Sequence, residues 1–403
     1  MKIGLLRETK MPVDTRVPLI PQQCRMIREE FPGVEVVVQP SSTRCYSDAA
    51  YRKEGMLVVE NLEGCDVLLG IKEVDPAALM AGKTYFFFSH TIKKQPYNKK
   101  LLKTVLEKHI KLIDYEILTD SRGIRIIGFG RWAGLIGAYE GMRAMCIRHK
   151  IPGLLKAAEC AGIKDVMNRA SQIPLPPWRI ALTGDGRVAG GVEEMMLAFG
   201  VRKVTVEDYL ADAYADVPVY VQLDSGKYNK RKDGAPFELL HFFEHPAAYE
   251  SNFARFCNKT DLLIMAAYWD PRAPVLFTPM QMKEHDFRIR VIADITCDIQ
   301  GAIPSTLRAS NFQEPFYDFN PATGKEEKAF SNESNITVMA IDNLPSGLPR
   351  EASEDFGHNL IKNVFSLVVS GDPERVIDRA TIAENGKLTK AYQYLSDWVN
   401  QQD

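Results

Sequence analysis

Short apolar runs alternate along the chain with longer amphipathic stretches, and this pattern predicts β-α-β units with mainly parallel sheets. In the first third of the chain several runs are apolar throughout, as in strands that are buried on both faces. The predicted strands there are residues 34–38, 67–71, 84–88, 111–115 and 125–129, after a strand-like opening at residues 2–8. The first third therefore predicts one mainly parallel sheet.

A change to helical spacing separates this series from a second one. Apolar side chains recur three and four positions apart from Trp132 to Cys146, which predicts a helix over residues 130–149. The second series predicts strands at residues 179–183, 204–207, 262–268, 291–296 and 337–341, a helix at 191–199, and a polar, irregular insertion at 216–236. Helical patterns at 350–370 and 389–398 follow, and we expect these helices to return to the first domain.

The chain length of 403 residues favours two domains, because a single hydrophobic core stops growing at roughly 250 to 300 residues. We therefore expect an α/β protein with two Rossmann-like domains, mainly parallel sheets and an active-site cleft between them. One domain is expected to comprise residues 1–139 and 345–403, and the other residues 140–344.

Charge and cysteine content narrow the classes of function. The formal net charge is -2 and the isoelectric point is about 6.4, so the chain lacks the basic field of nucleic-acid-binding proteins. The charged opening residues resemble neither a signal peptide nor a membrane span. The seven cysteines form no C-x-x-C pair and no metal pattern, which predicts reduced thiols and no metal site. We expect a cytoplasmic monomer or homodimer that acts on a small molecule.

Residues 178–191 predict a strand that runs into a glycine loop and then a helix. Gly184, Gly186 and Ala189 fit the G-x-G-x-x-G/A pattern of dinucleotide-binding loops. Glycine permits the tight turn and lets a pyrophosphate approach the backbone N–H groups of a helix N-terminus. A purely structural turn is the alternative. The flanking strand and helix favour a dinucleotide site, so we assign this function to the second domain.

Glu207 lies at the end of the next predicted strand, about 20 residues after the glycine loop. A carboxylate at such a position accepts hydrogen bonds from the adenosine ribose and repels a 2′-phosphate. Glu207 therefore predicts NAD rather than NADP, although neighbouring basic residues could still accommodate a phosphate.

Ionisable side chains follow two predicted strands of the first domain, Lys72 and Glu73 after one and His90 after the other. Open α/β sheets bind ligands at the carboxyl ends of their strands, which favours a shared site over a surface lysine and a structural histidine. A partly buried lysine can lose its proton near neutral pH, and histidine titrates there. We predict that Lys72 and His90 transfer protons, and that Glu73 and Glu116 hold positive charge on their neighbours.

Two arginines are candidates for binding a substrate carboxylate. Arg16 and Arg125 carry a planar guanidinium whose donors match the two oxygens of a carboxylate. Pairing with an internal acid is the alternative for either residue.

Several stretches resemble the alanine dehydrogenase and transhydrogenase superfamily, beginning with residues 3–8 (IGLLRE) and 15–19 (TRVPL). More selective stretches resemble the lysine-forming saccharopine dehydrogenases and the lysine–oxoglutarate reductase half of the bifunctional lysine-degrading enzymes. They are residues 70–73, 88–96, 114–116, 129–134, 293–298 and 341–352. The likeness spans nearly the whole chain, apart from residues 216–236.

The resemblance implies reversible, NAD-dependent oxidative cleavage of saccharopine to L-lysine and 2-oxoglutarate. It implies that Lys72 accepts the proton of the amine and that His90 is the acid and base of the carbinolamine steps. Further implied substrate contacts are Arg16, Lys72, Gln95, Arg125, Phe129, Thr296, Cys297 and Asp298, and Glu73, Lys93 and Glu116 would adjust pKa values. The implied dinucleotide contacts are Gly184, Gly186, Arg187, Val188, Glu207, Tyr268, Ile295, Ile341, Asp342, Asn343 and Leu344.

The cofactor and the direction of the reaction stay open at this point. The chain has Ile124 where the fungal enzymes carry a second basic residue, and its glycine loop resembles the reductase branch, which typically uses NADP. Glu207 argues for NAD instead. The alternatives are an NADP-dependent lysine–2-oxoglutarate reductase, an enzyme like alanine dehydrogenase, and a non-catalytic dinucleotide-binding module like the nucleotide domain of a proton-translocating transhydrogenase.

Overall fold

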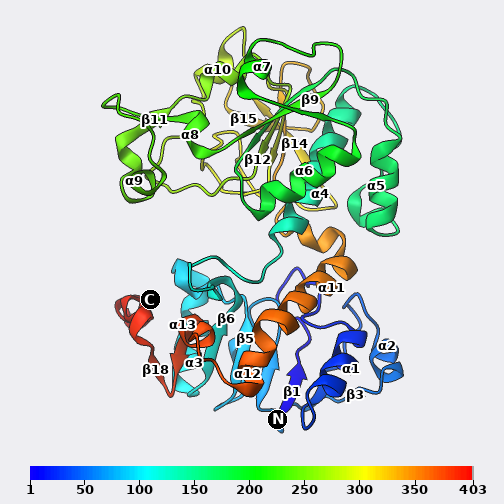
Figure 1. Cartoon of the computed structure of the whole chain (residues 1–403), viewed down its shortest axis with the longest axis vertical. Helices are drawn as coiled ribbons and strands as arrows, with labels where there is room; N and C mark the ends of the chain where they lie inside the picture. Colours follow the sequence, from blue (N-terminus) through cyan, green and yellow to red (C-terminus); the bar gives the residue numbers. More distant parts are fainter. Residues whose placement is uncertain (402–403) are drawn as a thin grey trace. The chain divides into compact units, whose positions relative to one another are not determined.

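The computed structural model describes residues 1–401, which form two compact units (Figure 1). Unit 1 consists of Met1–Phe129 and the segment from Pro349 onward, and unit 2 is Gly130–Leu348. Each unit is built on one eight-stranded sheet, and both sheets are mainly parallel, as the alternating pattern predicts. The α/β class with two Rossmann-like units is therefore confirmed, while the expected cleft stays a prediction.

The sheet of unit 1 has the strand order β18-β17-β6-β5-β4-β1-β2-β3. Its strands are β1 (Lys2–Leu5), β2 (Glu35–Val38), β3 (Leu57–Val58), β4 (Val67–Leu69), β5 (Thr84–Phe87), β6 (Lys111–Asp114), β17 (Thr381–Glu384) and β18 (Lys387–Leu388). Strands β1 to β6 run parallel, and β17 is antiparallel to β6. Consecutive side chains enter different cores: Phe86 packs on one face, whereas Tyr85 and Phe87 pack on the other. Both faces are therefore buried, which explains the continuous apolar runs.

Helices cover both faces of this sheet. They are α1 (Pro21–Glu30), α2 (Asp48–Lys53), α3 (Lys99–Glu107), α11 (Pro349–Leu360), α12 (Ser366–Ser370), α13 (Val376–Ala380) and α14 (Ser396–Asn400). Phe356 of α11 belongs to the core that also contains Ile113, and Val399 of α14 belongs to the other core. The chain thus returns to unit 1 after Leu348.

The sheet of unit 2 has the strand order β15-β14-β16-β13-β12-β7-β9-β8. Its strands are β7 (Arg179–Thr183), β8 (Arg202–Val204), β9 (Val219–Leu223), β12 (Leu262–Met265), β13 (Val291–Asp294), β14 (Phe316–Asn320), β15 (Lys325–Glu327) and β16 (Ile336–Met339). A separate antiparallel pair joins β10 (Asn229–Arg231) to β11 (Tyr249–Ser251). The helices are α4 (Gly130–Arg148), α5 (Ile163–Ser171), α6 (Arg187–Ala198), α7 (Val206–Leu210), α8 (Ser225–Tyr228), α9 (Leu239–Glu244) and α10 (Ala254–Cys257).

Helices α4 and α6 cross so closely that their backbones are in contact. A Cβ atom on Gly134 would lie 1.9 Å from the carbonyl oxygen of Val188, and one on Gly191 would lie 2.0 Å from that of Arg131. Only glycine fits at such a crossing. Because these contacts fix α4 in unit 2 from its first turn, the units divide after Phe129 and not after Tyr139.

Among the predicted elements that differ from the structure, three are relevant to the position of the site. Residues 125–129 form no strand, because Asp120 closes a turn by accepting from the backbone N–H groups of Arg122 and Ile124 and Gly128 has a φ of 155°. The strand predicted at 204–207 ends at Val204, and the Thr205 side chain accepts from Asp208 N to begin α7. The segment predicted to be irregular contains β9, α8 and β10. Within residues 1–401, no helix is long and apolar enough to span a membrane.

Candidate active site

The ionisable groups of unit 1 follow three neighbouring strands. Lys72 and Glu73 come after β4, His90 after β5, and Glu116 after β6, and these strands are adjacent in the order β6-β5-β4. Since the strands are parallel, their carboxyl ends meet at one edge of the sheet. The structure therefore brings the predicted proton-transfer residues to a shared edge.

Glu73 joins His90 to a lysine that sequence reasoning missed. Nδ1 of His90 lies 2.7 Å from Oε1 of Glu73, and Nζ of Lys10 lies 2.7 Å from Oε2. Glu73 is 8% exposed, and burial alone would raise its pKa, but the hydrogen bonds from His90 and Lys10 lower the pKa of Glu73 to about 2. Glu73 is thus an anion that fixes the imidazole through Nδ1, so Nε2 is the nitrogen that can exchange a proton with a ligand.

The loop that carries His90 is held by a buried carboxylate. Asp114, at the end of β6, accepts from the backbone N–H of Ser89 at 3.0 Å and from its hydroxyl at 2.5 Å. His90 itself has a φ of 53°, a conformation that non-glycine residues adopt rarely. Its ring stacks on Phe88 with centroids 6.4 Å apart. Asp114 and Phe88 therefore impose the position of the histidine.

Glu8 holds the backbone that carries Lys72. Its two carboxylate oxygens accept from Ile71 N at 2.7 Å and from Lys72 N at 2.9 Å. Burial raises the pKa of Glu8 to about 7, although these hydrogen bonds lower it. Glu8 follows β1, which pairs with β4, so a side chain at the end of β1 reaches the loop after β4.

Glu116 binds two of the predicted cations. Its Oε1 lies 3.1 Å from Nζ of Lys93 and 3.2 Å from Nη2 of Arg125. Burial alone would raise the pKa of Glu116, but Lys93 and Arg125 hold it below its ordinary value. Its Oε2 is buried and has no hydrogen-bond partner among the described residues. The second carboxylate oxygen of Glu116 can therefore accept a hydrogen bond from a donor group of a ligand.

The remaining predicted contacts of unit 1 lie beside this cluster. Arg16 is 3% exposed and forms a bidentate pair with Asp14, and its guanidinium lies 4.0 Å from the ring centroid of Phe129. Phe129 stacks on Phe356 at 4.6 Å. Gln95 accepts a hydrogen bond from the hydroxyl of Tyr97. Asp14 is thus the internal acid that pairs with Arg16, and Glu116, whose side chain is 15% exposed, pairs with Arg125.

The anionic state of Glu73 predicts a pH-dependent contribution to stability. Its pKa is lower in the folded protein than the ordinary value of 4.5, so the contribution is complete above pH 4.5 and is lost as the pH falls toward 2. We expect Glu73→Gln to lower the free energy of unfolding by roughly 2 kcal/mol at pH 7. The difference in the free energy of unfolding between the variant and the wild type should narrow below pH 4.5.

Urea unfolding between pH 7 and pH 3 measures this gap. Glu60→Gln is the matched control, because Glu60 also pairs with a cation, Arg7, but is exposed. That variant should change stability by less than 1 kcal/mol at either pH. A difference in unfolding free energy between Glu73→Gln and the wild type that stays constant with pH would contradict the assignment of a buried anion.

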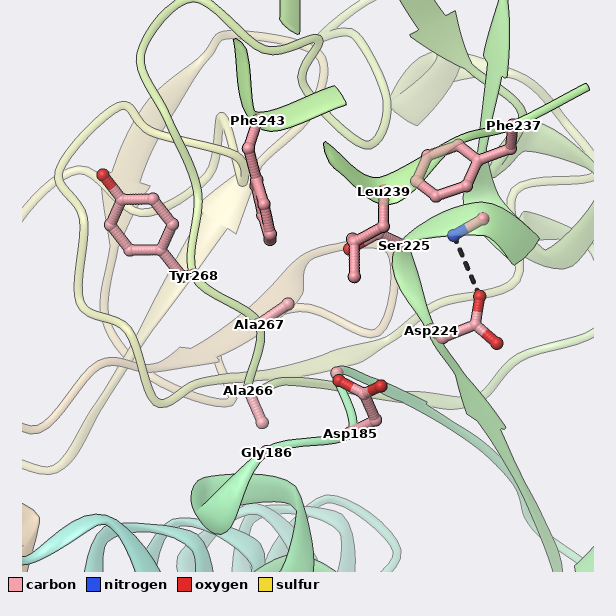
Figure 2. Close-up of a pocket in the computed structure, with 12 residues that line it drawn as sticks. Asp185, Gly186, Asp224, Ser225, Phe237, Leu239, Phe243, Ala266, Ala267 and Tyr268 are labelled. Carbon is pink, nitrogen blue, oxygen red and sulfur yellow. Dashed lines mark hydrogen bonds between the residues drawn. The ribbon is translucent and has the colours of Figure 1, made fainter. Parts of the chain in front are cut away.

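A pocket in unit 2 lies at the glycine loop, as Figure 2 shows. It has a volume of about 400 Å³ and is lined by Gly184, Asp185, Gly186, Asp224, Ser225, Gly226, Phe237, Leu239, Phe243, Ala266, Ala267 and Tyr268. The loop connects the end of β7 to α6, whose first residue is Arg187. The pocket therefore lies at the carboxyl end of the sheet, where open α/β sheets bind ligands.

The glycine loop fits a dinucleotide. Gly184 has a φ of 99°, and a Cβ atom there would lie 2.9 Å from the carbonyl oxygen of Ala266, so the turn requires glycine. A Cβ atom on Gly186 would meet nothing within 4 Å, which leaves space in front of α6. Among the described residues, no side chain caps this helix at Gly186. Its first N–H groups can thus receive a pyrophosphate.

The structure does not bring Glu207 to this pocket. Glu207 is exposed in the first turn of α7, after the edge strand β8. The strand beside β7 is β9, and Asp224 follows β9 directly and lines the pocket. The predicted position of Glu207 was wrong because β9 lies between β8 and β7. An apolar run ending in an acid, VYVQLD at residues 219–224, was the signal for the missed residue.

Some of the other predicted dinucleotide contacts are exposed, and the others are packed against neighbouring residues of unit 2. Tyr268 lines the pocket and is 82% exposed. Arg187 is exposed at the start of α6, and Asp342 is exposed after β16, whereas Asn343 is half-buried. Val188, Ile295, Ile341 and Leu344 instead lie in packed positions: Val188 contacts α4, Ile295 and Leu344 flank Gly137, and Ile341 is buried.

Asp294 organises the loop after β13 that was predicted to contact substrate. Its Oδ1 accepts from the hydroxyl of Thr296 at 2.6 Å and from Cys297 N at 3.2 Å, and its Oδ2 accepts from the hydroxyl of Thr306. The thiol of Cys297 donates to Ala340 O at 3.2 Å. The side chains of Thr296 and Cys297 thus form hydrogen bonds to other residues of unit 2, whereas Asp298 is exposed. No group of three His, Cys, Asp or Glu residues within 1–401 is arranged to hold a metal ion.

Comparison with known proteins relates the chain to amine dehydrogenases. Residues 4–136 match the family model described as alanine dehydrogenase/PNT, N-terminal domain. The alpha-aminoadipic semialdehyde synthase of Arabidopsis thaliana is 28% identical over 98% of this chain and 41% of its own length. The saccharopine dehydrogenase [NAD(+), L-lysine-forming] of Yarrowia lipolytica is 23% identical over 91% of this chain and 92% of its own length.

The chain spans less than half the length of the synthases that it matches. Among solved structures, an L-alanine dehydrogenase superposes with a TM-score of 0.68 at 18% identity, covering 99% of this chain and all of that one. A transhydrogenase from Sinorhizobium meliloti gives a TM-score of 0.60 at 16% identity, over 96% of this chain and all of its own. These two structures establish the fold. The chain is thus similar over most of its length to semialdehyde synthases and saccharopine dehydrogenases, and residues 4–136 match the alanine dehydrogenase/PNT N-terminal domain model.

Proposed function

We propose that the protein is a saccharopine dehydrogenase that forms L-lysine, with unit 1 as the substrate unit and unit 2 as the dinucleotide unit. The observation that carries the proposal is the cluster of Lys72, His90, Glu73 and Glu116 at three adjacent strand ends. A module that only binds a dinucleotide has no need of such a cluster. The names of the curated relatives support the same reaction class.

The proposed reaction joins an oxidation to a hydrolysis. Saccharopine loses a hydride from the glutaryl carbon next to nitrogen and a proton from that nitrogen, which gives an imine. Water adds to the imine carbon, and the resulting carbinolamine breaks its carbon–nitrogen bond to release lysine and 2-oxoglutarate. A bound nicotinamide supplies the hydride acceptor, or the hydride donor in reverse.

The residues of unit 1 would handle the protons of this sequence. Lys72 would accept the proton of the secondary amine, and its backbone is held by Glu8. His90 would remove a proton from water and return one to the leaving amine, with Glu73 holding the ring through Nδ1. Arg125 and Lys93 would bind substrate carboxylates, and the unpartnered Oε2 of Glu116 would accept from a protonated amine.

We propose NAD as the cofactor. The described residues that line the pocket include two carboxylates, Asp185 and Asp224, and no Lys or Arg. A 2′-phosphate would meet uncompensated negative charge there. This favours NAD over the NADP-dependent alternative. The seven free cysteines support a reducing compartment such as the cytoplasm.

An absorbance assay at 340 nm tests the proposed function. NADH should be consumed when both L-lysine and 2-oxoglutarate are present, and NADPH should react much more slowly. Pyruvate with ammonia is the control for an activity like that of alanine dehydrogenase. Consumption with pyruvate and ammonia alone would replace the proposal, and no consumption with either pair would leave only dinucleotide binding.

A further inference from the structure

We infer that residues 224–251 complete the adenosine half of the dinucleotide pocket, with Asp224 as the acceptor for the ribose hydroxyls and Leu239 and Phe243 as the apolar cover of the adenine. This inference rests on the proposed function, because it assigns parts of the pocket that already contains the glycine loop. The segment comprises α8, β10, α9 and β11.

Asp224 has the position that an acceptor for ribose requires. It follows β9, the strand paired with β7, and Gln222 in β9 donates to the carbonyl oxygen of Gly184 at 3.1 Å. This bond ties the end of β9 to the glycine loop. Oδ1 of Asp224 accepts from Gly226 N at 2.9 Å, which fixes the carboxylate. With a pyrophosphate in front of Gly186, the adjoining ribose would extend toward the neighbouring strand end, where Asp224 lies.

Helix α9 supplies an apolar wall. Phe242 packs into an aromatic cluster, with its ring centroid 5.5 Å from that of Phe237 and 5.0 Å from that of Tyr249. This contact orients the helix, so that Leu239 and Phe243, four positions apart on one face, line the pocket (Figure 2). Leu239 is 50% exposed and Phe243 is 54% exposed.

Continuity with the glycine loop identifies the occupant. The same pocket is lined by the loop, by Asp224, by Leu239 and Phe243, and by Ala266–Tyr268, so one molecule that reaches the loop also reaches α9. A flat, uncharged ring suits the apolar part, and hydroxyls suit the carboxylate. Adenosine with free ribose hydroxyls provides both groups.

Titration of the full chain with four ligands tests the inference: NADH, NADPH, ADP-ribose and reduced nicotinamide mononucleotide. Asp224→Asn should lower the affinity for NADH about tenfold and narrow the preference for NADH over NADPH, since a charged acceptor is lost. Glu207→Gln should leave both affinities unchanged. Phe243→Ala should lower the affinities for NADH and ADP-ribose about tenfold, the effect of removing a stacking ring. The affinity for the mononucleotide should stay unchanged.

Leu240→Ala is the matched control for the cover, because Leu240 is 76% exposed on the same helix and does not line the pocket. The inference is overturned if Phe243→Ala weakens ADP-ribose no more than Leu240→Ala does, or if Asp224→Asn leaves the NADH/NADPH ratio unchanged. In either case a wild type that binds NADH and consumes it with lysine and 2-oxoglutarate would retain the proposed function. A wild type that binds no dinucleotide would overturn both.

Discussion

Lys72→Met should lower the turnover of lysine and 2-oxoglutarate by roughly 10² to 10⁴ while dinucleotide binding stays near that of the wild type. The side chain of Met has a similar length but cannot accept a proton. Lys94→Met is the matched control, because Lys94 is an exposed lysine of the loop after β5 whose Nζ lies over the ring of Tyr394. It should retain wild-type turnover.

His90→Gln should cause a loss of the same order, because the amide keeps a donor for Glu73 but cannot exchange a proton near neutral pH. His109→Gln controls for backbone conformation, since His109 also has a left-handed φ, of 52°. The double variant should lose less than the product of the single losses, because both residues serve linked proton transfers. Single variants that keep full turnover and only unfold more easily would assign both residues a structural role.

Gly186→Val should weaken NADH binding by about 100-fold, the equivalent of two lost hydrogen bonds to a charged group. The backbone at Gly186 has a φ of -85° and a ψ of -167°, which any residue adopts, and an added Cβ atom meets nothing within 4 Å. Stability should therefore stay unchanged while the side chain occupies the space in front of α6. Thermal unfolding and NADH titration measure the two effects separately.

Gly190→Val is the control for this substitution. Gly190 lies in the same helix, is exposed, and also has no atom within 4 Å of an added Cβ. That variant should bind NADH like the wild type. Equal weakening by both substitutions, or a loss of stability in Gly186→Val, would contradict a pyrophosphate site at the helix N-terminus.

The sequence predicted the central strands of both sheets well because those strands are buried on both faces. β7 was predicted at its observed bounds, and β4, β5 and β6 within two residues. Their carboxyl ends follow from the parallel arrangement, so Lys72 and His90 could be assigned to one edge from the order of strands alone. The glycine loop was readable for a similar reason, since its spacing reflects a local turn.

Contacts between distant segments were not readable in this way. Lys10 reaches Glu73 across 63 positions, and Glu8 reaches Lys72 across 64, through the pairing of β1 with β4. The assignment of Glu207 failed because it assumed that consecutive strands are neighbours. In the structure β9 lies beside β7, and only strand pairing shows that Asp224 takes the position next to the glycine loop.

The fate of the hydride tests the central claim most directly. The chain is incubated with L-lysine, 2-oxoglutarate and NADH deuterated at both C4 positions, and the products are examined by mass spectrometry and NMR. A saccharopine dehydrogenase would yield saccharopine with one deuterium, on the glutaryl carbon bonded to nitrogen. Deuterated glutamate or 2-hydroxyglutarate, or saccharopine without deuterium, would contradict the account.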